Sequence, residues 1–467
     1  MGRTTESIAP KRGARHAAPP FALIPALLLL TPLLLGVAIW NRFPLVFYDT
    51  GAYFAQGLAG AFFVERSPIY SLLLPATGAF FSLWLTAAAQ ALMTAILICE
   101  LARAVAPRLT LPGLLGIVTA LMLLTGIGWY VGQIEPDCFT PLVVLGSYLL
   151  LFHRAAMPRG RLLATWCITG LAVASHPSHL GLIGGLLICA AALLAARRWM
   201  PDLPAPKLLP CLSALGLALA LLVAANFAFT REVFVSRAGS VFILARLMQD
   251  GIVQRLMTET CRPPGEPQPY SLCAYRNRMP RNANAWLWGE HSPFRVIGGF
   301  KRSDGEYGRI ARDSLVRYPL MHLRAAFLDS ARQFGQFKTG DGIESQQFIL
   351  VRAFRETVPE QLPAYQAARQ QTEPIRFRVI NLVHVPVGVL ALVGLFFLLQ
   401  HAARRGRWRE AALPLTVLLA LVGNAIICGT FSNPHDRYQS RLIWLPVLVL
   451  LLARARDPHV LEPLPEK

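Results

Sequence analysis

Charged residues are scarce in this sequence. Of its 467 residues, 15% are charged and 54% are hydrophobic, whereas a soluble domain carries about 25% charged residues. Apolar runs long enough to cross a bilayer, which takes roughly 20 helical residues, recur along the chain. The composition therefore excludes an ordinary soluble protein and predicts an all-α polytopic membrane protein.

Acidic residues are scarcer than basic ones. The chain has 26 Asp and Glu against 45 Lys and Arg, which gives a formal net charge of +19. In a soluble protein this excess would suggest nucleic-acid binding, but no RNP-like, zinc-finger or helix-turn-helix pattern is present. We expect no nucleic-acid partner, because basic residues in a membrane protein mark the cytoplasmic loops.

Common catalytic and metal-binding motifs are also absent. The chain has no GxSxG elbow, no Walker A loop, no HExxH and no GxGxxG after a strand. It has no CxxC and no zinc-type Cys/His cluster, so we predict no metal site from a motif. A cytosolic nucleotide-sugar domain is missing as well, which argues against a nucleotide donor.

Two of the eight cysteines differ from the rest in their surroundings. Cys261 and Cys273 flank a polar loop rich in proline and glycine, which suits a disulfide and hence an oxidising compartment. The other six lie in or beside apolar runs and are expected to be small hydrophobic residues: Cys99, Cys138, Cys167, Cys189, Cys211 and Cys428.

The apolar runs predict about ten transmembrane helices. They cover residues 21–40, 80–105, 111–130, 140–152, 162–175, 179–196, 208–229, 379–399, 413–430 and 442–452. A shorter run at 67–74 contains a proline and is expected to lie in the membrane interface. Arginines in alternate loops predict that both termini are cytoplasmic.

These runs divide the chain into five parts. We predict a cytoplasmic tail (1–20), an N-terminal transmembrane module carrying the catalytic outer loops (21–229), an extracytoplasmic domain (230–378), a C-terminal transmembrane module (379–456) and a cytoplasmic tail (457–467). Within the extracytoplasmic domain, residues 307–334 have helical spacing with a charged face. Under this topology, the polar loop motifs all fall on the outer side, where we expect the functional site.

Three acidic residues of the outer loops are candidates for catalysis. Asp49 follows the first span and would serve as a general base, or it would cap the helix that follows. Glu135 and Asp137 open the fourth span. They would form a second acidic site or ligate a metal, or they would stabilise a helix N-terminus.

Basic residues of the outer loops are candidates for binding phosphate. His176 and His179 flank a tight turn, so hydrogen bonding to phosphate and a structural role in the turn both stay open. Arg suits bidentate phosphate recognition, and Arg66, Arg437 and Arg441 lie on this side together with His435. The alternative is a salt-bridged loop at the level of the lipid headgroups.

The sequence resembles the GT-C superfamily of integral membrane glycosyltransferases, especially bacterial aminoarabinose transferases and protein mannosyltransferases. The resemblance rests on the acidic residue in Phe47-Tyr-Asp-Thr-Gly-Ala-Tyr53, on Arg-Ser-Pro-Ile-Tyr-Ser-Leu-Leu at 66–73, and on Glu135-Pro-Asp137. It covers residues 21 to about 200, and the C-terminal half matches only in its architecture.

The resemblance implies a polyprenyl-phosphate-sugar donor, an extracytoplasmic acceptor and a bacterial inner-membrane location. Asp49 matches the family's catalytic base, and Asp137 or Glu135 matches its second acidic position. Thr50 stands where the family often has a second carboxylate, so a divalent metal cofactor stays open. We therefore expect a one-step inverting glycosyltransferase of cell-envelope glycan or lipid modification. The alternatives are a transporter or flippase, and a non-catalytic membrane protein of envelope assembly.

Overall fold

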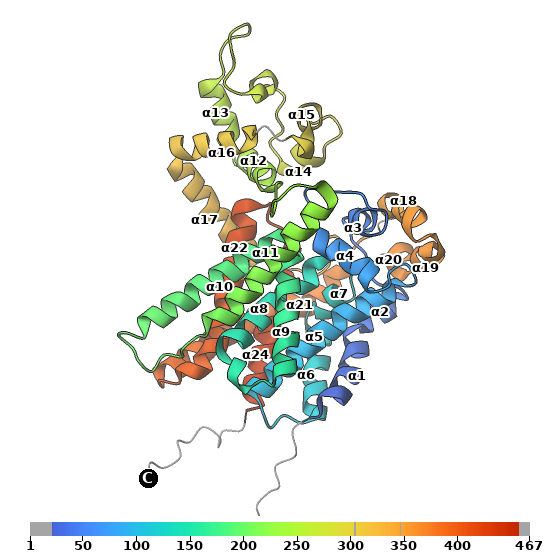
Figure 1. Cartoon of the computed structure of the whole chain (residues 1–467), viewed down its shortest axis with the longest axis vertical. Coiled ribbons are helices and arrows are strands. Elements are labelled where there is room, and N and C mark those ends of the chain that lie inside the picture. Colours follow the sequence, from blue (N-terminus) through green and yellow to red (C-terminus); the bar gives the residue numbers. More distant parts are fainter. Residues whose placement is uncertain (1–20, 303–304, 346, 457–467) are drawn as a thin grey trace, which may run out of the picture.

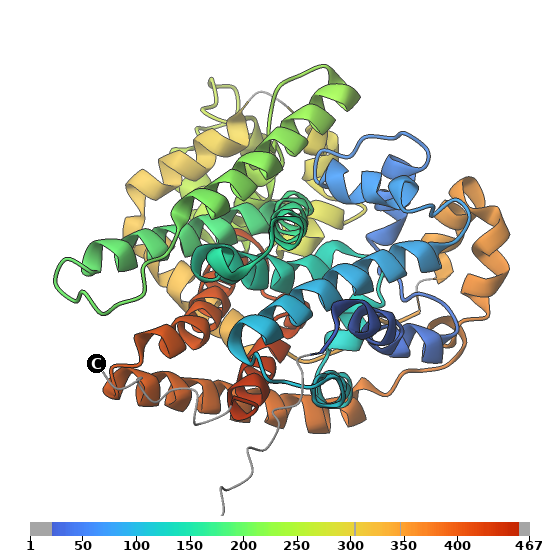
Figure 2. The same ribbon diagram turned by 60° about the horizontal axis from the view of Figure 1, so that its bottom comes forward.

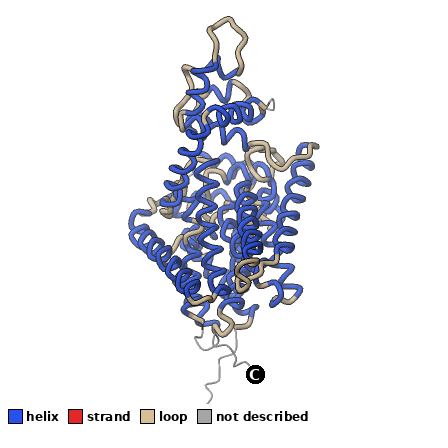
Figure 3. Tube along the Cα trace, turned by 90° about the vertical axis from the view of Figure 1, so that its left-hand side faces the viewer, coloured by secondary structure: helices blue, strands red, loops and turns tan. Residues whose placement is uncertain are grey.

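The computed structural model describes residues 21–302, 305–345 and 347–456, which form a helical bundle with a smaller helical body beyond one end (Figure 1). No strand occurs among these residues, and an isolated bridge joins Leu45 to Gln133. The expected all-α fold is confirmed for this part of the chain (Figure 3). The tails predicted at 1–20 and 457–467 lie outside the described residues.

The bundle contains membrane-length helices, as expected. Five are long and apolar enough to cross a bilayer: α5 (Leu83–Val105), α10 (Pro177–Ala196), α11 (Leu208–Thr230), α21 (Phe377–Arg404) and α22 (Trp408–Phe431). Shorter helices pack among them (Figure 2): α1 (Leu23–Leu34), α6 (Leu111–Leu124), α8 (Phe139–Phe152), α9 (Arg159–Ala174) and α24 (Trp444–Arg454). The polytopic character is supported, and the figure of about ten spans stays a prediction.

Two of the predicted runs are each divided into two helices. The run at 21–40 forms α1 and α2 (Gly36–Asn41), and the run at 111–130 forms α6 and α7 (Ile127–Val131). The second break lies at Thr125, whose backbone is extended. Breaks of this kind leave no trace in a hydropathy pattern, because both halves are apolar.

The body beyond the bundle, hereafter the outer body, has its own hydrophobic core, to which Leu244, Leu256, Trp286 and Ile310 belong. It is built from α12 (Gly239–Gln249), α13 (Ile252–Thr260), α14 (Ala283–Trp288), α15 (Pro293–Val296) and α16 (Glu306–Arg317). A disulfide joins Cys261 to Cys273 within it, with a Cα–Cα distance of 5.5 Å. From this body α17 (Pro319–Gly335) runs to the bundle and packs along α22 (Figure 1).

Residues 347–372 lie elsewhere, although they belong to the same predicted stretch of 230–378. They form α18 (Gln347–Thr357), α19 (Leu362–Gln366) and α20 (Arg369–Thr372), and α18 packs against α3 (Thr50–Gly57). Phe354 stacks on Tyr365 with ring centroids 4.2 Å apart, and both rings join the core of the bundle. The stretch between α11 and α21 therefore supplies two structural units.

Candidate active site

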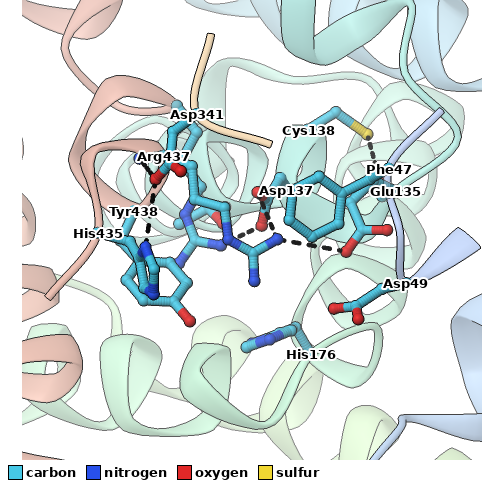
Figure 4. Close-up of polar contacts among 12 residues, drawn as sticks. Phe47, Asp49, Glu135, Asp137, Cys138, His176, Asp341, His435, Arg437 and Tyr438 are labelled. Atoms are coloured by element: carbon cyan, nitrogen blue, oxygen red, sulfur yellow. Dashed lines mark hydrogen bonds and ion pairs between the residues drawn. The ribbon is translucent and has the colours of Figure 1, made fainter. Parts of the chain in front are cut away.

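Loops from distant parts of the chain meet at the end of the bundle that faces the outer body (Figure 4). The backbone N–H of Leu45 donates to Gly132 O at 2.9 Å, and that of Ile134 donates to Leu45 O at 2.8 Å. The Thr50 hydroxyl adds a hydrogen bond to Ile134 O at 3.0 Å. These contacts hold the loop of Asp49 beside the loop of Glu135.

Asp49 is paired with Arg66. It occupies the N-cap position of α3, but its side chain makes no capping hydrogen bond. Instead its Oδ1 accepts a hydrogen bond from Arg66 Nη2 at 2.5 Å. The helix-capping alternative for Asp49 is therefore not what the structure shows.

The local sequence after Arg66 explains its position. Ser67 caps α4 (Pro68–Ala76) by accepting a hydrogen bond from the N–H of Ile69, and Pro68 occupies the first helical position. The Ser67 hydroxyl also donates to Ala174 O at 2.6 Å, which ties the start of α4 to the end of α9. These contacts hold Arg66 at the end of the bundle that faces the outer body.

Glu135 and Asp137 contact the two arginines of the last polar loop. Asp137 lies in a short 3-10 helix (Pro136–Cys138) and pairs with Arg441, whose side chain is completely buried. Arg437 Nη1 lies 3.7 Å from Glu135 Oε1 and 3.7 Å from Asp137 Oδ2. Asn424 of α22 donates to Tyr438 O at 2.7 Å and so positions α23 (Asp436–Ser440), the helix that carries Arg437.

The surroundings of Glu135 and Arg437 raise the pKa of both groups, which favours a neutral carboxyl group but a charged guanidinium group. Burial, together with the charges of Asp49 and Asp137, raises the pKa of Glu135 well above its usual range. Burial opposes the charge of Arg437, but Asp137 outweighs it, and the pKa of Arg437 lies above its ordinary value. The shift therefore favours the neutral form of Glu135 and the charged form of Arg437.

The guanidinium group of Arg437 has unused hydrogen-bonding capacity. Among the described residues, its Nε and Nη1 atoms are buried without a hydrogen-bond partner. Leaving a charged donor unsatisfied is costly. Arg437 also lines a cavity, and its positive charge favours an anion there.

Asp341 belongs to the site and was missed by the sequence reasoning. Its Oδ2 accepts a hydrogen bond from the backbone N–H of Arg437 at 3.1 Å and lies 3.5 Å from His435 Nδ1. Burial alone would raise the pKa of Asp341, but the hydrogen bonds from His435 and from the Arg437 N–H outweigh it and lower that pKa. Gly340 and Gly342, which flank it, adopt φ values of +111° and +76°. This Gly-Asp-Gly pattern was the signal available in the sequence.

The two histidines of the outer turn have different roles. His176 caps α10, because its Nδ1 accepts a hydrogen bond from the N–H of Ser178 at 3.2 Å. Burial lowers the pKa of His176 well below its usual value. Burial therefore favours the neutral ring, which carries its proton on Nε2 because Nδ1 accepts a hydrogen bond.

His179, in contrast, makes hydrogen bonds inside the bundle. Its side chain is fully buried. Its Nε2 lies 2.7 Å from Thr140 Oγ1, and its Nδ1 lies 2.7 Å from Ala172 O. Both ring nitrogens are thus used between α8, α9 and α10, so we leave His179 out of the ligand-binding set.

A cavity opens in front of these residues. It holds about 550 Å³ of empty space, part of it open to solvent. The bundle lines it with Tyr48, Asp49, Arg66, His435 and Arg437, among others. The opposite wall belongs to the outer body and includes Phe242, Arg246, Asn284 and Trp288. We call this cavity the polar cleft.

Asp49, which lines the polar cleft, and Asp137, which lies near Arg437 of its wall, are each paired with an arginine. Within the described ranges, no group of three or more His, Cys, Asp or Glu side chains could hold a metal ion. Asp49 and Asp137 contact guanidinium groups, which occupy the oxygens a divalent cation would need. The residues fit an anion bound by arginine better than they fit a metal ion.

No protein-family model, curated protein or solved structure matches the chain. The functional argument therefore depends on the polar cleft and on the residues that form it.

Proposed function

We propose that this protein is a membrane glycosyltransferase that moves a sugar from a polyprenyl-phosphate donor to an extracytoplasmic acceptor. One observation carries the proposal: the polar cleft contains both Asp49 and the buried, charged Arg437, whose Nε and Nη1 atoms have no hydrogen-bond partner. A carboxylate and an anion-binding guanidinium are the two groups that transfer from a lipid phosphate requires. Glycan or lipid modification of the cell envelope is the process that this chemistry suits.

The reaction would proceed in one step. Asp49 accepts the proton of the acceptor hydroxyl through Oδ2, while Arg66 holds Oδ1. The acceptor oxygen attacks the anomeric carbon, the bond from that carbon to the phosphate oxygen breaks, and its electron pair stays on the phosphate. Arg437 stabilises the departing charge, as donors aimed at a developing anion do. Attack opposite the leaving group inverts the anomeric centre.

The surroundings of Arg66 offer a route for the lipid tail. Arg66 also lines a smaller pocket, of about 330 Å³ of empty space, with Pro177, Leu180, Leu222 and other residues. Leu180 and Leu222 belong to α10 and α11, which are membrane-length helices. A polyprenyl chain lying between these helices would bring its phosphate to the polar cleft.

The distribution of charge supports a location in the bacterial inner membrane with the polar cleft outside. Arginines gather at the opposite end of the bundle, as expected for the cytoplasmic side: Arg103, Arg108, Arg154, Arg159, Arg161, Arg197, Arg198, Arg404, Arg405, Arg407, Arg409, Arg454 and Arg456. The outer body would then be periplasmic, and both termini cytoplasmic. A transporter is less well supported, because transporters bind substrate near the bilayer midplane and the polar cleft lies at one end of the bundle.

Release of polyprenyl phosphate tests the proposal. The wild type, Asp49→Asn, Arg437→Gln and the control Asp202→Asn, at an exposed turn far from the polar cleft, are purified in detergent. Each is incubated with a panel of polyprenyl-phosphate sugars and a bacterial envelope extract that supplies the acceptor. We expect turnover by the wild type and the control, and a loss of about 10²–10⁴-fold for Asp49→Asn.

Each result has a distinct meaning for the proposal. A folded Asp49→Asn protein with full turnover would show that Asp49 is not the base. Full turnover by Arg437→Gln at low donor concentration would remove Arg437 from the phosphate site. No turnover by the folded wild type with any donor would contradict the transferase and favour a non-catalytic role in envelope assembly.

A further inference from the structure

Two adjoining cavities lie at the end of the bundle opposite the polar cleft. One, with about 890 Å³ of empty space, is lined by residues of α21, α22 and α24. The other, with about 750 Å³, lies between the end of α5 and the facing ends of α22 and α24. Both are lined by Val105, Glu410 and Arg456, so together they form one trough with two arms. We call it the basal trough.

Arginines line both arms of the basal trough. Arg407 and Arg454 line the first arm, Arg108 and Arg409 line the second, and Arg456 lines both. Within the described residues, Glu410 is the acid that lines them. It lies 3.7 Å from Arg456 Nη1 and 4.0 Å from Arg407 Nη1, so the ion pairs are loose. One carboxylate does not balance Arg407, Arg409, Arg454 and Arg456, so the part of the trough that the structure describes attracts anions.

Arg456 is held in place at the junction of the two arms. Its Nε donates a hydrogen bond to Val105 O at 2.8 Å, and its side chain is only 21% exposed. Arg197 and Arg198, at the same end of the bundle, line neither arm. Arginines that only set the orientation of a protein in the membrane do not need to line a cavity. The arginines of the basal trough line one, so orientation alone does not explain their positions.

The walls between the arginines are apolar. Leu398, Leu413, Val449 and Leu452 line the first arm, and Leu413 and Leu452 are buried at 2% and 0% exposure. Ala104, Pro107 and Tyr148 line the second arm. A ligand that fits must present anionic groups to arginine and a hydrocarbon body to leucine and valine. Among membrane components, an anionic phospholipid has both.

We propose that the basal trough binds a phospholipid that carries two phosphate groups, one in each arm on either side of Arg456. The pair of arms carries this inference, because a lipid with one phosphate would fill only one of them. Such a lipid would join α5 to α21, α22 and α24. The inference does not depend on the transferase activity.

Lipid binding by the full-length protein in nanodiscs tests this inference. The discs contain a zwitterionic phospholipid alone, or with an anionic lipid of one or of two phosphates, and retained lipid is measured by native mass spectrometry. The variant Arg409→Gln/Arg454→Gln removes one arginine from each arm, and Arg197→Gln/Arg198→Gln is the matched control. We expect the two-phosphate lipid to be preferred, and the variant to weaken its binding about 30-fold, since each arginine near a lipid headgroup contributes about fivefold.

Three results would overturn the inference. Equal retention of the one-phosphate lipid would remove the two-phosphate assignment. Equal loss in the control variant would show general surface attraction. Competition by inorganic phosphate at the concentration of the lipid would make the basal trough a site for a free anion.

Discussion

Glu135 and Asp137 lie two residues apart and yet have different partners. Asp137 pairs with the buried Arg441 and also lies 3.7 Å from Arg437, whereas among the described residues Glu135 has Arg437 alone within the ion-pair range, at 3.7 Å. In the described part of the chain, Glu135 Oε2 is buried without a hydrogen-bond partner. The two carboxyl groups therefore differ in which protonation state the fold favours.

Replacing Glu135 by glutamine should change how stability depends on pH. The folded protein raises the pKa of Glu135, so its stabilising contribution is complete below the unfolded pKa of about 4.3 and is lost as pH rises through the folded pKa. Glutamine is neutral at every pH. We expect Glu135→Gln to match the wild-type Tm near pH 4 and to exceed it by a few degrees near pH 9, measured by differential scanning fluorimetry.

Asp137→Asn serves as the comparison for that experiment. It removes the partner of a fully buried arginine, a change that costs about 3–5 kcal/mol, and it should lower the Tm at both pH values. A lower Tm for Glu135→Gln than for the wild type at pH 9 would contradict a raised pKa of Glu135.

At the residue scale, the sequence supplied candidates but not their pairing. Asp49, Arg66 and Arg437 could be chosen because each is a charged residue next to an apolar run. The contact between Asp137 and Arg441 joins residues 304 positions apart, and no local pattern encodes such a pair. Asp341 was missed because its segment has no membrane span to set it apart.

At the scale of elements, the crossing of α3 and α4 places Asp49 beside Arg66. Gly57 of α3 makes the crossing possible, because a Cβ atom there would lie 2.0 Å from the backbone oxygen of Ser71. The Ser71 hydroxyl also donates to Gln56 Oε1 at 2.9 Å. The distance between the two helices thus determines the Asp49–Arg66 contact.

Gly57→Ala should therefore impair activity, although Gly57 lies at the end of α3 opposite Asp49. The added methyl group forces α3 away from α4, at a cost of about 1–3 kcal/mol, and separates Asp49 from Arg66. We expect at least about a tenfold fall in polyprenyl-phosphate release, since small misplacements of catalytic groups are costly. Gly184→Ala in α10, where a Cβ atom meets nothing within 4 Å, is the control. Unchanged release by Gly57→Ala would show that the helix crossing does not position the site.

Element types were predictable, whereas their placement was not. The apolar runs predicted the bounds of α5, α10, α11, α21 and α22 to within a few residues, because membrane helices need long hydrophobic runs. The position of α18 on α3 depends on Phe354 and Tyr365. Aromatic residues in an amphipathic helix do not show which surface they will cover.

At the scale of the whole molecule, α17 joins the outer body to the bundle. It crosses α22 at Gly429, where a Cβ atom would lie 2.7 Å from the backbone of Asp329. The side chain of Asp329 pairs with Arg246 of α12, and Arg246 lines the polar cleft. The position of the outer wall of the cleft therefore depends on this crossing.

Gly429→Ala should loosen the outer body. The methyl group cannot be accommodated against a backbone, so α17 moves away from α22 and the polar cleft widens. We expect faster amide hydrogen exchange in α12 and α17 and a lower rate of polyprenyl-phosphate release, with the bundle helices unchanged. In Gly423→Ala, the control, the new atom is 3.9 Å from its nearest neighbour. Exchange rates equal to the wild type in Gly429→Ala would refute this role of the crossing.

The long separation between Asp137 and Arg441 also has a consequence for biosynthesis. Asp137 leaves the ribosome 304 residues before Arg441, and at roughly 5–20 residues per second this interval lasts about 15–60 seconds. During that time the first helices are in the membrane, but the carboxyl groups of Glu135 and Asp137 have no arginine partner yet. This end of the partly synthesised bundle must therefore stay hydrated until the last helices insert and Arg437 and Arg441 can pair with the two carboxyl groups.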